Sequence, residues 1–322
     1  MPTGATDIQI PNVAGATIIT VPTGTQAARS VVIVGDETLA ITGGSLTVGS
    51  ASTATLGTLS IAGGTLSGTG SWAVRNLNVS SCTINTSANI NVSNAFTWSG
   101  GTVGGTGDLT TAGVSTLSAA TIRTLQGRNW NNQGTVDLTN GRLVVNGGTF
   151  INEATRVVNV TSGDADPIAG TAGTFTNAGT LNWNTSGPAF LGSSMTAFNN
   201  TGMVNVDGGT LRTLTGGTDT GVYNVAAGGT LAFHQGVTRN LNAGSNITGA
   251  GALVVDGAVN VRGNLGIAGT GTVSIGDVLA SLDIDTVGTG VTFANTLTTL
   301  RGGLSGADNL TLNGAFNSAG GM

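Results

Sequence analysis

Asp164 and Asp166 have a spacing that suits calcium binding. They lie in the segment TSGDADPIAG, which is rich in small residues and contains a proline. Two carboxylates two residues apart can bind Ca²⁺ together with main-chain carbonyl oxygens, because Ca²⁺ prefers several oxygen ligands. The segment is therefore interpreted either as a calcium-binding loop or as a solvated insertion between structural elements.

A second pair, Asp283 and Asp285, lies in the segment LDID. Alternate residues of a strand share a face, so both carboxylates point outward if Leu282 and Ile284 point inward. A polar exterior explains such a pair. Clustered acids on one face, with an arginine nearby, are also what a polysaccharide-degrading site requires for acid–base chemistry.

Histidine and tryptophan supply the remaining candidates. His234 is the only histidine, so a histidine metal site or a Ser–His–Asp triad would depend on it, and no G-x-S-x-G motif accompanies it. Its alternation within LAFHQGV predicts an outward position at a corner. Trp72, Trp98, Trp130 and Trp183 could stack on sugars, but three of them occur within repeated phrases, which favours packing in a core.

The composition narrows the class of protein. The chain has 322 residues, of which 55 are Gly, 39% are hydrophobic and only 8% are charged. Val, Ile, Leu and Thr occur throughout, which favours packed β structure over disorder. All ten basic residues are Arg and the net charge is −5, so no basic stripe is available for nucleic acid.

The single cysteine and the lengths of the apolar runs narrow the class of protein further. Cys82 is the only cysteine and cannot form an intrachain disulfide, so it is interpreted as a small buried residue. Such sparse use of cysteine fits a secreted protein. No apolar run approaches the roughly 20 residues of a membrane helix, so no membrane span is predicted.

Glycines placed before alternating apolar segments reveal a repeat. Successive examples are Gly179, Gly202, Gly229, Gly251 and Gly271, with a mean step of about 23 residues, a period typical of stacked repeats. Between them the sequence alternates apolar with polar or small residues, as a short strand with one buried face does. Short strands and tight corners at this period predict an all-β fold, a right-handed parallel β-helix (β-solenoid) with roughly 20–27 residues per coil. We expect residues 1–322 to form one continuous solenoid, with 1–35 as an N-terminal capping segment.

The segment FNNTGMVNVDGGTL, from Phe198, gives the repeat in detail. The aromatic residue is predicted to enter the core before a bend, the asparagines to pair along the stack at the bend, and the glycine to form the turn. Related phrases begin at Trp130, Phe175 and Phe316. The last, FNSAGGM, stops within the phrase, which predicts an uncapped C-terminal end.

Several segments resemble β-solenoid repeats of large secreted bacterial surface proteins. They are FTWSGGTVGGTGDLTTAG (96–113), NWNNQGTVDLTNGRLVVNGGTF (129–150) and the run 198–233, while 16–49 resembles the start of such solenoids. The proteins concerned are adhesin-like, filamentous-haemagglutinin-like and autotransporter-passenger-like. The resemblance covers nearly the whole chain and implies a location outside the cell or on its surface.

Two classes of function follow. The leading hypothesis is a non-catalytic structural or adhesive rod, a stalk or filament subunit that self-associates head to tail or continues into a longer solenoid. The alternative is a carbohydrate-binding or polysaccharide-degrading β-helix with an acidic lateral groove. No cofactor is predicted apart from the Ca²⁺ that Asp164 and Asp166 would bind, and a glycan or a cell surface is the partner expected besides a second copy.

Overall fold

The computed structural model describes residues 4–15, 17–267, 271–286, 288, 290–293 and 297–317; the side chains of 264–267, 293 and 297–300 lie outside this description. The described residues form strands joined by turns and bends, without a helix. None of them therefore belongs to a helix long and apolar enough to cross a membrane. The predicted all-β class is confirmed.

The chain divides into two compact units, Met1–Ile151 and Asn152–Met322, and the last strand of the first unit runs one residue past its boundary. The strands of the first unit are β1 (Asp7–Ile10), β2 (Ile18–Val21), β3 (Thr25–Ala28), β4 (Ser30–Ile33), β5 (Thr38–Ile41), β6 (Ser45–Val48), β7 (Ser52–Ala62), β8 (Thr65–Gly68), β9 (Trp72–Ser80), β10 (Cys82–Thr86), β11 (Ile90–Trp98), β12 (Gly101–Gly105), β13 (Leu109–Thr111), β14 (Val114–Leu117), β15 (Ile122–Gln126), β16 (Trp130–Asn132), β17 (Thr135–Leu138), β18 (Arg142–Asn146) and β19 (Thr149–Asn152).

The strands of the second unit are similarly short, apart from two long ones. They are β20 (Val157–Val160), β21 (Ile168–Thr171), β22 (Thr174–Asn177), β23 (Thr180–Leu191), β24 (Ala197–Asn200), β25 (Met203–Thr213), β26 (Gly217–Asp219), β27 (Val222–Val225), β28 (Thr230–Phe233), β29 (Thr238–Leu241), β30 (Asn246–Gly249), β31 (Ala252–Val255), β32 (Ala258–Val261), β33 (Asn264–Ile267), β34 (Val273–Ile275), β35 (Ser281–Ile284), β36 (Val291–Phe293), β37 (Leu297–Leu300), β38 (Gly303–Ser305), β39 (Leu310–Leu312) and β40 (Phe316–Asn317).

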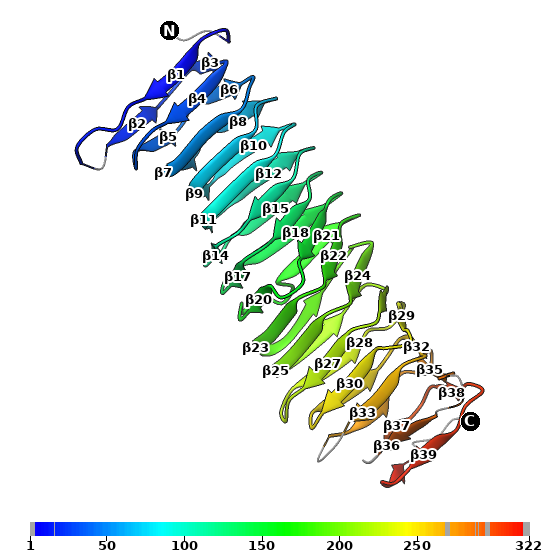
Figure 1. The fold of residues 1–322 in the computed structure, drawn as a ribbon. Coiled ribbons are helices and arrows are strands. Elements are labelled where there is room, and N and C mark those ends of the chain that lie inside the picture. The colour runs from blue at the N-terminus through cyan, green and yellow to red at the C-terminus, as the bar shows by residue number, and fades with distance from the viewer. Residues whose placement is uncertain are drawn as a thin grey trace. The chain divides into compact units, whose positions relative to one another are not determined.

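Three parallel ladders run through the first unit, and each coil adds a strand to every ladder (Figure 1). One ladder joins β3, β6, β8, β10, β12, β15 and β18. The long strands β7, β9 and β11 each bend and serve two ladders, and their pairings shift register at the bend. This arrangement is a coil with three faces, wound repeatedly in one direction.

The second unit has the same design. One ladder joins β22, β24, β26, β29, β32, β35 and β38, and β23 and β25 each serve the other two. The strand pairings among the described residues of this unit are parallel, and paired residues are separated by one coil. Because parallel strands cannot be joined by a hairpin, stacked coils are the simplest way to make them from such short segments.

Coil length varies more than a strict repeat would allow. The step along the chain from Thr65 to its partner Thr83 is clearly shorter than the step from Ile275 to its partner Leu300. The predicted parallel β-solenoid is thus confirmed, with some coils shorter than the range expected from glycine spacing. Extra residues are placed at bends and in loops such as 161–167, so the ladders continue undisturbed.

Inward side chains form apolar rows that repeat once per coil. In the first unit one such row is Leu46, Leu66, Ile84, Val103 and Leu125, each at most 3% exposed. All four tryptophans are fully buried, as are Phe175 and Phe198. The predicted core position of the repeated aromatic is confirmed for these, while Phe316 in the last described strand is 48% exposed.

Outward side chains of the same strands form polar rows. The residues that flank the Leu46 row are hydroxyl-bearing in six successive coils, namely Thr25, Ser45, Thr65, Thr83, Thr102 and Thr124. They are exposed or half-buried, while the residue after each is inward. Strands in such a ladder lie about 4.8 Å apart, so one face presents hydroxyl groups at a fixed short interval.

Stacked corners bring main chains close together, and Gly202 illustrates the consequence. A Cβ atom at this position would lie 2.1 Å from the carbonyl oxygen of Gly179, one coil earlier. The carbonyl belongs to the main chain and cannot rotate away. The glycine is therefore required by close approach of the coils rather than by turn conformation alone.

Gly202→Ala should lower the free energy of unfolding by roughly 1–3 kcal/mol, because overpacking forces main-chain shifts. Gly187→Ala is the matched control, since a Cβ there would meet nothing within 4 Å. Urea unfolding followed by circular dichroism measures both variants. Equal midpoints for the two would contradict the assigned close approach of the coils.

Cys82 begins β10 and is 6% exposed. The predicted burial of this residue is confirmed. Burial raises the pKa of its thiol to about 11, from an ordinary value of 9.0. The neutral thiol is thus favoured in the folded chain, so this group stabilises the fold below pH 9 and loses that contribution as the pH rises through 11.

Alkylation of Cys82 by iodoacetamide should therefore be slow in the native protein and should accelerate only as the pH approaches 11. In urea the same reaction should accelerate near pH 9, because the thiolate is the reactive form. Circular dichroism at each pH checks that the protein remains folded. A native profile that coincides with the profile in urea would show that the thiol is exposed.

Candidate functional site

The second unit contains a buried network of charged and polar side chains, centred on Asp219 and Arg239. Both side chains have no exposed surface, although they lie on neighbouring coils, in β26 and β29. Arg239 Nη2 donates to Asp219 Oδ1 at 2.5 Å and also to Oδ2. A charge-assisted pair of this kind offsets part of the cost of removing both charges from water.

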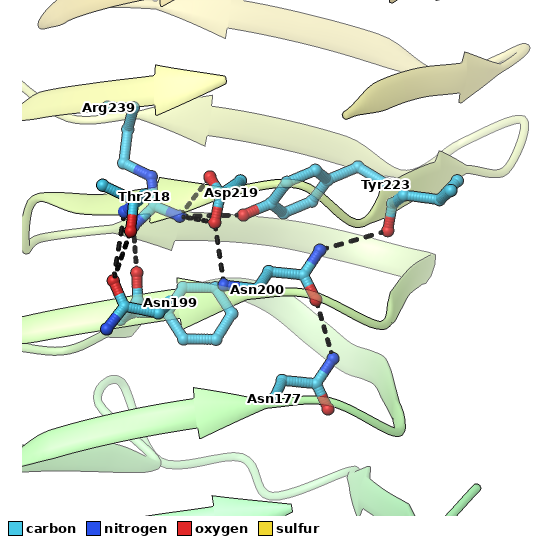
Figure 2. A network of polar contacts seen from close by, with 9 residues as sticks. Asn177, Asn199, Asn200, Thr218, Asp219, Tyr223 and Arg239 are labelled. Carbon is cyan, nitrogen blue, oxygen red and sulfur yellow. Dashed lines mark hydrogen bonds and ion pairs between the residues drawn. The ribbon is translucent and has the colours of Figure 1, made fainter. Parts of the chain in front are cut away.

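Other polar groups of the network are paired as well (Figure 2), apart from Arg239 Nε, which has no hydrogen-bond partner among the described residues. Arg239 Nη2 also donates to the Tyr223 hydroxyl at 2.9 Å, and Nη1 donates to the carbonyl oxygen of Phe198 at 2.6 Å. The main-chain N–H of Asn200 donates to Asp219 Oδ1 at 2.9 Å. Arg239 therefore holds groups from its own coil and from the two coils before it.

Burial determines the electrostatics of these groups. It raises the pKa of the Asp219 carboxyl, and the Arg239 guanidinium opposes the rise together with the N–H of Asn200. Burial also raises the pKa of the Tyr223 hydroxyl well above its ordinary value. Tyr223 is thus a neutral group whose hydroxyl oxygen accepts a hydrogen bond from the Arg239 guanidinium.

A ladder of asparagines leads to this network. Asn152 Nδ2 donates to Asn177 Oδ1, and Asn177 Nδ2 donates to Asn200 Oδ1, each at 2.8 Å. All three side chains are fully buried, and the same amides also donate to nearby carbonyl oxygens. The predicted pairing of bend asparagines along the stack is confirmed in this unit.

Asp219 occupies the next rung of the asparagine ladder, because it pairs with Asn200. The change from Asn to Asp coincides with a change from Phe198 to Gly217 two residues earlier. A Cβ at Gly217 would lie 2.5 Å from Arg239 Nη1, so the glycine leaves space for the guanidinium. The guanidinium carbon lies 5.2 Å from the centre of the Phe198 ring, a distance that permits a cation–π contact.

The first unit buries two more arginines, with different partners. Arg123 donates to the carbonyl oxygens of Trp98 and Ala119 at 2.5 Å, of Asn140 at 3.0 Å and of Thr121 at 3.4 Å. Burial lowers the pKa of this guanidinium, yet four carbonyl dipoles surround it.

Arg128 is likewise held by uncharged oxygens. Its Nη2 donates to the carbonyl oxygens of Thr86 and Ala88 and to the Thr86 hydroxyl. Burial lowers its pKa to about 10, and the charge of Asp108 partly opposes this. Both arginines thus donate to main-chain carbonyl groups, and those of Ala119 and Thr121 also accept a main-chain N–H.

The predicted calcium residues lie in the loop between β20 and β21. Asp166 is 7% exposed, and Asp164 is half-buried. Asp164 Oδ1 accepts the N–H of Asp166 at 2.8 Å, while the Ser162 hydroxyl oxygen accepts the N–H of Asp164. Among the described residues, no three His, Cys, Asp or Glu side chains gather closely enough to hold a metal ion. Calcium binding by this loop stays a prediction.

Asp283 and Asp285 project outward from the β35 segment, as predicted, while Leu282 and Ile284 are buried. Arg262 lies between the carboxylates, with Nη2 3.2 Å from Asp283 Oδ2 and Nε 3.5 Å from Asp285 Oδ2. The side chains are about one-third to one-half exposed, and such surface ion pairs contribute little to stability.

The positions of His234 and the four tryptophans follow from their packing contacts. His234 is half-buried, with Nδ1 3.0 Å from its neighbour's carbonyl oxygen and its ring 6.0 Å from Phe190. The indole N–H of Trp98 donates to Gly100 and that of Trp130 to Thr111. Because all four tryptophans are fully buried, the interpretation as core residues is confirmed and they present no surface to a sugar.

The buried arginines and Asp219 were not identified from the sequence. Two signals point to them: every cation is Arg, and the phrase Phe-x-Asn becomes Gly-x-Asp at residues 217–219. Arginine suits a buried position better than lysine, because its planar group donates in several directions.

No protein-family model matches this sequence, and neither curated proteins nor solved structures give a match. The resemblance to bacterial surface solenoids therefore rests on the repeat segments themselves.

Arg239→Met should destabilise the second unit by about 3–5 kcal/mol, because it leaves a buried carboxylate without its counter-charge. The pKa of Asp219 should rise further, so the variant should regain stability as the pH falls. Asp219→Leu combined with Arg239→Met should recover much of the loss. Urea unfolding at several pH values measures these effects.

Arg262→Met is the matched control, since it removes an exposed arginine from its carboxylates and should cost less than about 1 kcal/mol. Equal losses for Arg239→Met and Arg262→Met would show that burial of the Asp219–Arg239 pair carries no special cost.

Proposed function

We propose that this β-solenoid is a non-catalytic structural and adhesive scaffold on the outside of a bacterial cell, a stalk or filament subunit. The observation that carries the proposal is the repetition of the same outward chemistry from coil to coil. The hydroxyl row from Thr25 to Thr124 repeats one group in six successive coils. Many equivalent weak contacts on one face suit adhesion, because their effects multiply when they engage together.

The internal chemistry supports the same proposal. The charged groups of the Asp219 network are used to hold neighbouring coils, and the buried arginines of the first unit serve the main chain. Groups committed in this way stabilise the scaffold and leave its exterior to contact partners. The single buried cysteine suits a location outside the cell.

Head-to-tail self-association is the form of assembly that we propose. The first coils enclose an apolar cavity of about 230 Å³, whose lining includes Ile8, Ile19, Val21, Leu39 and Leu46. Near the other end of the described chain, Leu304 and Phe316 are 38% and 48% exposed. In this proposal the exposed Leu304 and Phe316 of a second copy dock against that cavity, and stacking of this kind would repeat without closing.

Purified protein should form particles whose mass grows with concentration in multi-angle light scattering, and filaments in negative-stain images. Ile19→Asp should prevent this, because it places a charge in the apolar cavity. Thr83→Asp, on a lateral face, is the matched control and should assemble normally. A monomer at every concentration would contradict self-association.

The carbohydrate-binding alternative rests on one observation, the exposed Arg262 between Asp283 and Asp285. Such a group resembles the acidic, arginine-flanked surface that a sugar site requires. A glycan array with wild-type protein and with Asp283→Asn distinguishes the two functions. Specific binding that this substitution abolishes would replace the scaffold proposal, whereas binding that is unaffected by it favours a distributed adhesive face.

A further inference from the structure

The turn between β17 and β18 contains Asn140 followed by Gly141, a dipeptide with its own chemistry. A main-chain nitrogen that follows asparagine can attack the side-chain amide carbon, and glycine imposes no Cβ that would obstruct the attack. Gly141 has a φ of +63°, and a Cβ there would lie 2.3 Å from the carbonyl oxygen of Thr121. The glycine is thus required by the fold, which fixes the reactive dipeptide in place.

The attacking and accepting groups are already side by side. The N–H of Gly141 donates to Asn140 Oδ1 at 2.9 Å. The nitrogen is therefore close to the amide group of the same side chain, and rotation about the Cα–Cβ bond of Asn140 brings Cγ towards the nitrogen. Asn140 is exposed, so water reaches its side chain.

The carbonyl oxygen of Asn140 accepts a hydrogen bond from Arg123 Nη1 at 3.0 Å. This carbonyl and the N–H of Gly141 belong to one peptide unit. When the nitrogen loses its proton, the negative charge spreads onto that oxygen. A fixed cation at the oxygen stabilises the charge as it develops, and it does so more strongly where water is excluded.

We propose that Asn140 is a site of spontaneous deamidation, activated by the buried guanidinium of Arg123. The nucleophile is the deprotonated main-chain nitrogen of Gly141. The product is an aspartate or an isoaspartate at position 140.

The reaction proceeds in two steps. Hydroxide takes the proton from the Gly141 nitrogen, and the nitrogen forms a bond to Asn140 Cγ. The bond from Cγ to Nδ2 breaks, and Nδ2 takes a proton from water and leaves as ammonia. Water then opens the cyclic imide at one of its two carbonyl carbons, which gives either aspartate or isoaspartate without any oxidation or reduction.

The same unit contains a natural comparison, Asn146 followed by Gly147. Gly147 has a φ of +67°, close to that of Gly141. The carbonyl oxygen of Asn146, however, accepts the neutral N–H of Gly127 at 2.7 Å, and the Asn146 amide donates to Gln126 at 3.3 Å. The Asn146–Gly147 pair can therefore undergo the same reaction. Its peptide carbonyl accepts a hydrogen bond from a neutral N–H, whereas that of Asn140 accepts one from a cation.

The modification would alter the turn that produces it. Isoaspartate adds a methylene group to the main chain, and this displaces the carbonyl that Arg123 holds. Either product also adds a negative charge to the first unit. The turn at Asn140 would thus loosen with age faster than the turn at Asn146.

The test is to incubate the full chain at mildly alkaline pH, natively and in urea, and to quantify deamidation at each asparagine by peptide mapping with mass spectrometry. In the native protein Asn140 should react about tenfold faster than Asn146, the effect of one unit of amide acidity. In urea the two rates should be similar, because the Arg123 contact is lost. A native Asn140 rate equal to or below that of Asn146 would overturn the proposal.

Arg123→Met provides the second arm. If circular dichroism shows that this variant folds, its Asn140 rate should fall to that of Asn146, and an unchanged rate would overturn the proposal. If the variant does not fold, the comparison of native protein with protein in urea decides by itself.

Discussion

The dry interior of the solenoid is the constraint on which the rest of the structure depends. Several inward polar groups find their hydrogen-bond partners on the coil before or after. The Asn152–Asn177–Asn200 ladder does this with neutral amides, and Arg239 does it across three coils. Unpaired buried polar groups cost as much as a lost hydrogen bond or more, so the pairing fixes which residues must stack.

The Asp219 network shows how the asparagine ladder accommodates an aspartate at one of its positions. Replacing a ladder asparagine with aspartate would bury a charge, but Gly217 leaves room for the Arg239 guanidinium and Phe198 supplies a ring face beneath it. Asp219, Gly217 and Arg239 are therefore compatible with the buried ladder only as a set. Buried ion pairs seldom add net stability, and what this one does provide is a set of specific contacts between successive coils.

Arginine has two distinct structural uses inside this fold. Arg239 neutralises a carboxylate, whereas Arg123 and Arg128 bind carbonyl oxygens at turns. A cation bound to carbonyls keeps its charge available to the peptide units that it touches. Arg123 therefore both supports the fold, through the carbonyl oxygens that it binds, and acts on the reactivity of the Asn140–Gly141 peptide unit. The exterior carries mainly hydroxyl and amide groups.

Sequence patterns were enough to predict the parallel coil, the burial of the repeated aromatic residues, the pairing of bend asparagines and the outward position of Asp283 and Asp285. Each of these follows from alternation or from repetition within a few residues, which is a local property. The burial of Arg123, Arg128, Asp219 and Arg239, and the groups that they hold, became apparent from the folded structure. Several of their partners lie one or two coils away, as with Arg239 and Phe198, which are 41 positions apart in the sequence. Because the length of a coil varies along the chain, separation in the sequence does not reveal which side chains stack.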